Sequence, residues 1–180
     1  MKFKEKSVIL DAEQSKRIIS RMAYEILERN KGAEDVIIIG IQTKGVLLAK
    51  AIRNEIFEHE GVKIPMGTLD ITFYRDDLTR LEAHPIVKDT HIPFSIEDKR
   101  IILVDDVLYS GRTVRSAMDE IFDMGRPEKV ELAVMIDRGQ REVPISADYA
   151  GRKVPTAKNE YINVDISEDG VISKVSICSL

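Results

Sequence analysis

The sequence contains few of the residues on which several common kinds of site depend. It has one cysteine, Cys178, so a disulfide within one chain is excluded and a reducing compartment is expected. Its three histidines show no metal-binding spacing such as HExxH, which argues against a protein-built zinc site. No apolar run approaches the roughly 18 residues that cross a bilayer, and no apolar stretch near the N-terminus is long enough for a signal peptide. A cytoplasmic protein without contact to a membrane is therefore expected.

Positive charge is also scarce. Lysine and arginine together number 27, against 31 aspartates and glutamates, which gives a net charge of −4. Uniform binding to nucleic-acid backbones is excluded by this balance, because it needs clustered cations, although a local basic face remains compatible with it. The motif G-x-x-x-x-G-K-[ST] is absent from the sequence, which excludes a P-loop nucleotide site.

Strongly apolar segments alternate with amphipathic segments along the chain. Buried strands are predicted from the apolar runs at 36–41, 64–73, 101–105 and 130–136. Apolar residues at helical spacing predict three helices. The first follows an N-cap at Asp11 and ends at Gly32, the second covers 46–58, and the third covers 113–124 and ends at Gly125. This alternation predicts an α/β fold with a parallel sheet flanked by helices, in a single domain over 1–180. The segments YINVDI and VISKVSI near the C-terminus predict a hairpin.

The segment IILVDDVLYSGRT combines a buried strand with two carboxylates and a loop of hydroxyl side chains. In open parallel sheets, ligands bind outside the carboxyl ends of the strands, so Asp105 and Asp106 are expected to project there. Backbone N–H groups at the next helix, flexible Gly111, and the hydroxyls of Ser110 and Thr113 predict a phosphate site. Two carboxylates would repel a phosphate, so they are expected to contact sugar hydroxyls or a hydrated Mg²⁺. A ribose phosphate meets both requirements.

The same segment resembles the phosphoribosyl-pyrophosphate (PRPP) motif of the type I phosphoribosyltransferase family. The motif covers Ile101, Ile102, Leu103, Val104, Asp105, Asp106, Val107, Leu108, Tyr109, Ser110, Gly111, Arg112 and Thr113. The segments GIQTKG, LDITFYRDDL, GRPEKVELAVMIDRGQRE and ADYAGRKVPT are similar to those of the bacterial members that both attenuate transcription of the pyrimidine operon and act on uracil. The resemblance implies a type I phosphoribosyltransferase fold, a mainly parallel twisted sheet with a small hood region built from the terminal segments.

A glycosyl transfer is the reaction that the resemblance implies: uracil and PRPP give UMP and diphosphate, with Mg²⁺ bound to PRPP. Asp105, Asp106 and Arg75 are then the catalytic residues, and the two aspartates hold the ribose hydroxyls and, directly or through water, the metal. The segment 108–113 surrounds the 5′-phosphate.

Three further segments acquire roles from the resemblance. GIQTKG is similar to the family's pyrophosphate loop, formed by Gly40, Ile41, Thr43, Lys44 and Gly45. Tyr74, Arg75 and Asp76 lie where the family has a mobile loop that closes over the site, in a stretch without clear periodicity at 74–99. Backbone groups near Met135, with Asp137 and Arg138, are expected to read the edges of uracil.

The family members concerned also bind a stem-loop in the leader mRNA of the pyrimidine operon when UMP is present. The cations expected at such an RNA surface are Arg21, Arg29, Arg141, Arg152, Lys153 and Lys158. This chain departs from the usual pattern at Tyr24 and Gln140, where histidine is common, and at Ser146, where arginine is common. A homodimer or larger homo-oligomer is implied as well.

Two alternatives remain open from the residues themselves. One is a transferase for a purine base, because no residue pattern distinguishes uracil from another base. The other is an RNA-binding regulator with little catalytic turnover. Lys44 makes the second alternative plausible, because the family usually has arginine there and lysine lacks the bidentate fork that grips pyrophosphate.

Overall fold

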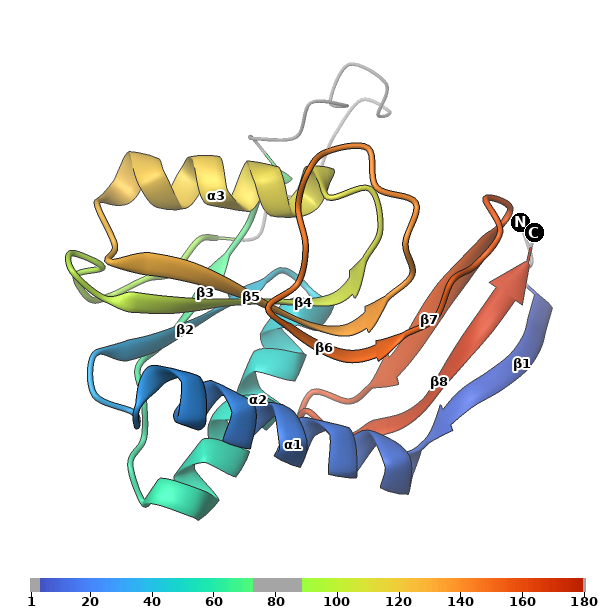
Figure 1. Cartoon of the computed structure of the whole chain (residues 1–180), viewed down its shortest axis with the longest axis horizontal. Helices are drawn as coiled ribbons and strands as arrows, with labels where there is room; N and C mark the ends of the chain where they lie inside the picture. Colours follow the sequence, from blue (N-terminus) through green and yellow to red (C-terminus); the bar gives the residue numbers. More distant parts are fainter. Residues whose placement is uncertain (1–3, 73–88, 180) are drawn as a thin grey trace.

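The computed structural model of the protein describes residues 4–72 and 89–179. Its centre is a five-stranded parallel sheet with the order β3-β2-β4-β5-β6 (Figure 1). The strands are β2 (Val36–Ile41), β3 (Met66–Leu69), β4 (Arg100–Leu108), β5 (Lys129–Asp137) and β6 (Tyr149–Lys153). The predicted α/β class with a parallel sheet is confirmed.

Helices cover both faces of this sheet. Helices α1 (Ala12–Asn30) and α2 (Lys44–Glu60) lie on one face and α3 (Arg112–Met124) lies on the other (Figure 1). Val36 and Ile38 of β2 belong to the core under α1 and α2, whereas Ile37 and Ile39 belong to the core under α3. Alternate residues of one strand thus enter different cores, which is why the run VIIIGI is apolar throughout. None of the helices in the described ranges is long and apolar enough to span a membrane.

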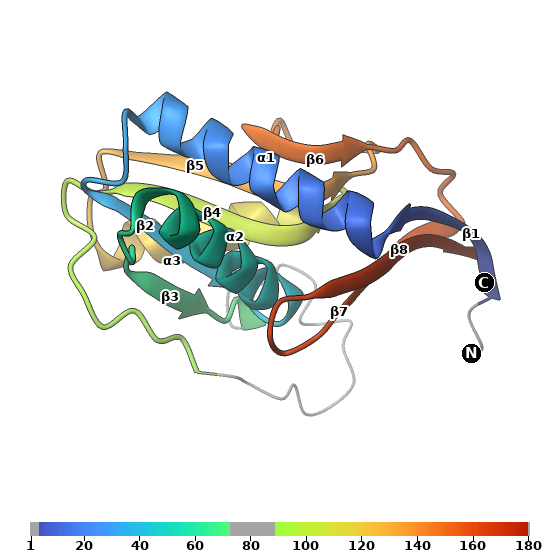
Figure 2. The ribbon, with the colours of Figure 1, turned by 90° about the horizontal axis from the view of Figure 1, so that it is seen from below.

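A second sheet is built from segments that are distant in sequence. Strands β1 (Lys4–Asp11), β8 (Ile172–Ser179) and β7 (Glu160–Ile166) pair antiparallel in the order β1-β8-β7. Figure 2 shows this sheet to one side of the main sheet. The predicted C-terminal hairpin is confirmed as β7 and β8, whereas β1 was not predicted, because its exposed residues carry no apolar alternation.

The ends of several elements differ from the predicted ends. The capping box of α1 is confirmed: the Asp11 carboxylate accepts from the Gln14 N–H at 2.8 Å, and the Gln14 side-chain oxygen accepts from the Asp11 N–H at 3.1 Å. Helix α2 begins at Lys44, two residues before the predicted start. Strand β3 is shorter than predicted. Strand β6 was not predicted, because only two of its five residues are buried and they form no apolar run.

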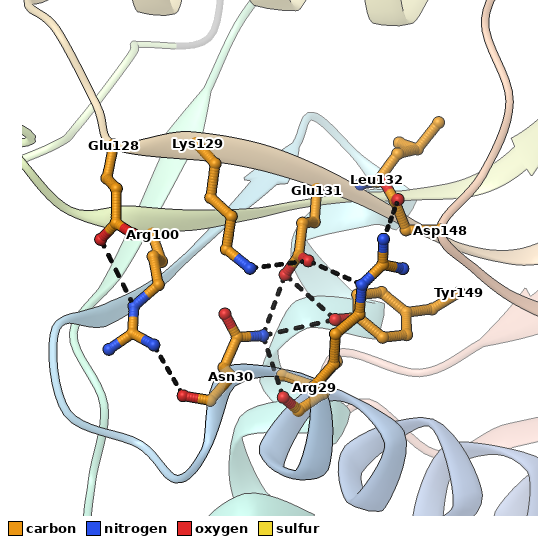
Figure 3. A network of polar contacts seen from close by, with 10 residues as sticks. Arg29, Asn30, Arg100, Glu128, Lys129, Glu131, Leu132, Asp148 and Tyr149 are labelled. Carbon is orange, nitrogen blue, oxygen red and sulfur yellow. Dashed lines mark hydrogen bonds and ion pairs between the residues drawn. The ribbon is translucent and has the colours of Figure 1, made fainter.

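A network of polar side chains joins α1 to the amino ends of β5 and β6 (Figure 3). Buried Glu131 accepts from Asn30 at 2.9 Å, from the Tyr149 hydroxyl at 3.0 Å and from Lys129 at 3.0 Å, and it pairs with Arg29 at 3.1 Å. Burial by itself would raise the pKa of Glu131, but these hydrogen bonds and charges outweigh it and lower the pKa. The network fixes the end of the sheet opposite to the carboxyl ends of the strands.

Candidate active site

Asp105 and Asp106 lie inside β4, not after its end. The predicted end of this strand at residue 105 is therefore wrong, since β4 continues to Leu108. The pairing of β4 with its neighbouring strands explains why the two carboxylates are nevertheless accessible. Strand β2 pairs with β4 only as far as Val104, whereas β5 continues alongside from Asp105 to Leu108. On the side of β2, β4 therefore has no paired strand from Asp105 onward, at the carboxyl end of the sheet where ligands of such folds bind.

The electrostatics of the aspartate pair favour a cation or hydroxyl donors. Burial, and then the neighbouring charge of Asp106, raise the pKa of Asp105 well above its usual range. The Asp105 carboxylate accepts one hydrogen bond, from the Asp106 N–H at 2.9 Å. Within the described ranges no group of three or more histidine, cysteine or acidic side chains could hold a metal. The pair therefore fits a Mg²⁺ that takes its remaining oxygen ligands from a substrate and from water.

The loop after β4 leads directly into the N-terminus of α3. Gly111 is the N-cap of α3, with φ of +89°, and it offers no side chain to the N–H groups of the first turn. A Cβ atom at this position would also lie 2.7 Å from Cγ2 of Val143. Ser110 Oγ accepts from the Arg112 N–H at 3.3 Å. The arrangement suits an anion such as the 5′-phosphate, because the N–H groups and the helix dipole both favour negative charge.

The loop between β2 and α2 folds tightly onto β4. A Cβ atom at Gly45 would lie 2.4 Å from the Val104 carbonyl oxygen and 3.1 Å from the Asp105 Cα. A Cβ atom at Gly40 would lie 2.5 Å from the Val46 Cα, so the loop also closes on itself. Two segments separated by 60 residues in sequence, Gly45 and Asp105, are thus in backbone contact. The structure brings the predicted pyrophosphate loop and the predicted sugar-binding carboxylates together.

Within this loop, the side chain of Lys44 reaches the second sheet. Its ammonium donates to the Asn163 Oδ1 on β7 at 3.0 Å, and Asn163 Nδ2 donates to Asp165 at 2.7 Å. Thr43 precedes Lys44 as the N-cap of α2, and Ile41 is buried at the end of β2. The partner Asn163 was missed from the sequence, because nothing local to either residue indicates a contact across 119 positions.

The segment after β5 contains the residues expected to bind the base. Asp137 ends β5 and accepts from the Gly139 N–H at 3.0 Å and from Arg141 at 2.6 Å. Burial would raise the pKa of Asp137, but these two partners outweigh it and lower the pKa. Arg138 is buried, donates to Thr156 Oγ1 at 2.8 Å, and lies over the Tyr109 ring at 4.1 Å. Asp137 and Arg138 therefore lie beside the PRPP loop.

Two other predictions concern the backbone near Met135 and the segment 74–76. The Met135 side chain is buried in the core under α1, so only backbone groups of this part of β5 could face a base. Tyr74, Arg75 and Asp76, expected in a closing loop, lie outside the described residues.

The cations expected at an RNA surface do not form one exposed cluster, and several of them make hydrogen bonds or ion pairs within the protein. Arg21 donates to the Gly151 carbonyl at 2.6 Å, and Arg152 donates to the Ile9 carbonyl at 2.8 Å. Arg29 pairs with Glu131 and Asp148, at the far end of the sheet (Figure 3). Arg141 makes hydrogen bonds within the segment after β5, and Lys153 and Lys158 are exposed. Their role in RNA binding stays a prediction.

A comparison with known families agrees with the fold. The phosphoribosyl transferase domain family matches residues 6–169, so the chain is a phosphoribosyl transferase domain by class. Hypoxanthine phosphoribosyltransferase from Trypanosoma cruzi has the same fold, with a TM-score of 0.76 over 96% of this chain and 95% of that chain. At 18% identity this likeness shows the fold alone.

Two close relatives identify the family within this class. A protein of Deinococcus radiodurans is 52% identical over 163 residues, covering 91% of this chain and 89% of that protein. A protein of Caldicellulosiruptor bescii is 55% identical over 167 residues, covering 93% and 90%. Each is named bifunctional protein PyrR. The chain therefore belongs to the PyrR family of phosphoribosyltransferase-fold proteins.

Proposed function

We propose that the protein transfers the phosphoribosyl group of PRPP to uracil and releases UMP and diphosphate, with Mg²⁺ carried on PRPP. The observation that carries the proposal is the backbone contact of Gly45 with Val104 and Asp105. This contact lies between the segment 40–45, which we propose to hold pyrophosphate, and the half-buried Asp105 and Asp106. The relatives named bifunctional protein PyrR, about half of whose residues are identical, support uracil as the base.

The site suits displacement at an anomeric carbon, which passes through an oxocarbenium-like state. Catalysis of such a step consists largely of positioning and of stabilising charge. Asp105 and Asp106 orient the ribose hydroxyls, the N-terminus of α3 holds the 5′-phosphate, and the loop ending at Gly45 holds the pyrophosphate. A bound Mg²⁺ would neutralise the negative charge of the leaving pyrophosphate.

A second activity, binding of pyrimidine-operon leader mRNA in the presence of UMP, belongs to the same proposal. The word bifunctional in the names of the relatives supports it. Arg152, Lys153 and Lys158 are exposed cations near the C-terminal part of the chain, where a phosphate backbone can be met without the whole protein being basic. We further propose that the protein forms a homo-oligomer in the cytoplasm, where its single cysteine is reduced.

The experiment that tests the enzyme is release of diphosphate from PRPP and Mg²⁺ with uracil, hypoxanthine, guanine, adenine and orotate in parallel. Turnover with uracil alone supports the proposal, whereas turnover with a purine refutes the choice of base and leaves the PRPP site intact. Absence of turnover with every base, together with binding of UMP, would instead establish a regulator with little catalysis.

RNA binding is tested by a gel shift with the cognate leader stem-loop and with a scrambled hairpin of the same composition. UMP is expected to strengthen the shift of the cognate RNA alone. An equal affinity for both RNAs at every UMP concentration contradicts the regulatory half of the proposal. Light scattering of the same samples measures the oligomeric state.

A further inference from the structure

The guanidinium of Arg141 is the centre of a set of hydrogen bonds between two loops of the site. It donates to the Ile145 carbonyl at 2.7 Å, to the Tyr109 carbonyl at 2.8 Å and to the Gly139 carbonyl at 3.3 Å. It also pairs with the Asp137 carboxylate at 2.6 Å. The side chain is 23% exposed. Most of its donor capacity is therefore directed into the protein and not towards solvent.

These contacts join the PRPP loop to the segment expected to bind the base. Tyr109 belongs to the loop between β4 and α3, and Asp137 is the last residue of β5. The connection is reinforced by the backbone, since the Arg138 N–H donates to the Leu108 carbonyl at 3.0 Å and the Glu142 N–H donates to the Ser110 carbonyl at 2.9 Å.

The geometry requires an arginine. Two of its nitrogens, Nη1 and Nη2, reach Tyr109 and Asp137 at the same time, on different segments of the chain. The planar fork of five donors permits this, whereas the ammonium of a lysine is a compact point charge on a flexible stem. An arginine that contacted RNA phosphates would use the same fork, so a change to lysine would weaken either role. The two roles are distinguished by the ligand that is lost: UMP if Arg141 positions the loops, and leader RNA alone if it contacts RNA.

We propose that Arg141 is a positioning residue for the nucleotide. It holds the phosphate loop at Tyr109 and the base segment at Asp137 in one fixed arrangement, so that the two ends of a nucleoside monophosphate meet both segments without reorganisation of the protein. This inference rests on the proposed function, because it assumes that a nucleotide spans these segments. The pyrophosphate loop is not in contact with Arg141 through any hydrogen bond that the described residues form.

The test compares Arg141→Lys and Arg141→Gln with the unchanged protein. Binding of UMP and, separately, of inorganic pyrophosphate with Mg²⁺ is measured by calorimetry, and the KM for PRPP is measured with uracil. The matched control is Arg17→Gln, which removes an arginine that pairs with Glu13 on the exposed surface of α1. Circular dichroism and thermal unfolding check that each variant is folded.

Both Arg141 variants are expected to weaken UMP binding by about tenfold to a hundredfold, since the loss of one or two charge-assisted hydrogen bonds has effects of this size. Pyrophosphate binding stays within about twofold, because the hydrogen bonds between the guanidinium and the described residues lie in the other two segments. A general loss of folded protein would instead lower the number of binding sites for both ligands and leave the dissociation constants unchanged. If Arg141→Lys binds UMP as the unchanged protein does, the inference is overturned.

Further outcomes keep the inference separate from the proposed function. If both variants bind UMP normally but bind leader RNA weakly, Arg141 contacts RNA and the positioning role is wrong. If the unchanged protein shows no turnover with uracil, the enzyme proposal fails while UMP calorimetry still decides the role of Arg141. If neither variant folds, Asp137→Asn removes the anionic partner of Arg141 and keeps the size of the side chain, and it is expected to weaken UMP binding without weakening pyrophosphate binding. Normal UMP binding by a folded Asp137→Asn protein overturns the inference.

Discussion

A methyl group at Gly45 is the smallest change that separates the pyrophosphate loop from the aspartate pair. In Gly45→Ala the new Cβ would lie 2.4 Å from the Val104 carbonyl oxygen and 3.1 Å from the Asp105 Cα. The first distance is about 1 Å short of ordinary contact, and both neighbours are backbone atoms that cannot rotate away. The loop must therefore move by about that distance. Overpacking of this kind costs about 1–3 kcal/mol of stability.

The effect on catalysis is expected to exceed the effect on stability. A displacement of about 1 Å between the groups that hold the two halves of PRPP lowers kcat/KM for PRPP by about a hundredfold. The assay is initial-rate release of diphosphate at varied PRPP, with the free energy of unfolding measured by chemical denaturation. The control is Gly67→Ala on the edge strand β3, whose Cβ would lie 2.9 Å from Ile92 Cγ1 and 3.3 Å from the His91 carbonyl oxygen.

Both variants crowd a Cβ against a neighbouring segment, but only Gly45 belongs to the predicted pyrophosphate loop. Gly67→Ala is expected to lose stability and much less activity. The reasoning is refuted if Gly45→Ala keeps its kcat/KM for PRPP, or if both variants lose activity in equal proportion while remaining folded.

Three further predictions concern the charges of the site and of the sheet. Asp105→Asn and Asp106→Asn should each lower kcat/KM for PRPP by about a hundredfold or more. Asp105→Asn should do so without loss of stability, because burial and the neighbouring charge of Asp106 penalise the charged form of Asp105. Full activity in both variants would show that the site is misassigned. Glu131→Gln should destabilise the protein at pH 7 by about 1–3 kcal/mol in chemical denaturation, because it leaves buried partners without a charged acceptor. Because the pKa of Glu131 is lower in the folded protein, its charge stabilises the fold above the pKa of the unfolded chain, and this contribution is lost as the pH falls through the folded pKa. The difference in stability between Glu131→Gln and the unchanged protein should therefore shrink below about pH 4. A difference that stays constant with pH would contradict the assignment.

Local patterns were sufficient for the elements that position the site. The apolar run of β2 predicted a strand buried on both faces, and Asp11 with Gln14 predicted the start of α1. The PRPP motif predicted which strand end carries the carboxylates, although β4 runs on through them to Leu108. Each of these signals depends on residues within a few positions of one another, where the periodicity of a strand or the geometry of a helix end leaves a pattern in the sequence.

The sequence by itself therefore determined the α/β class, the order of most elements and the motif that defines the family. Only the tertiary structure decided that Gly45 touches Asp105, that Lys44 reaches Asn163, and that Arg141 is directed into the protein. The physical reason is the same in each case. Such contacts join segments far apart in the chain, and they form only when packed layers bring particular backbone atoms within a few ångströms, which no pattern local to either segment encodes.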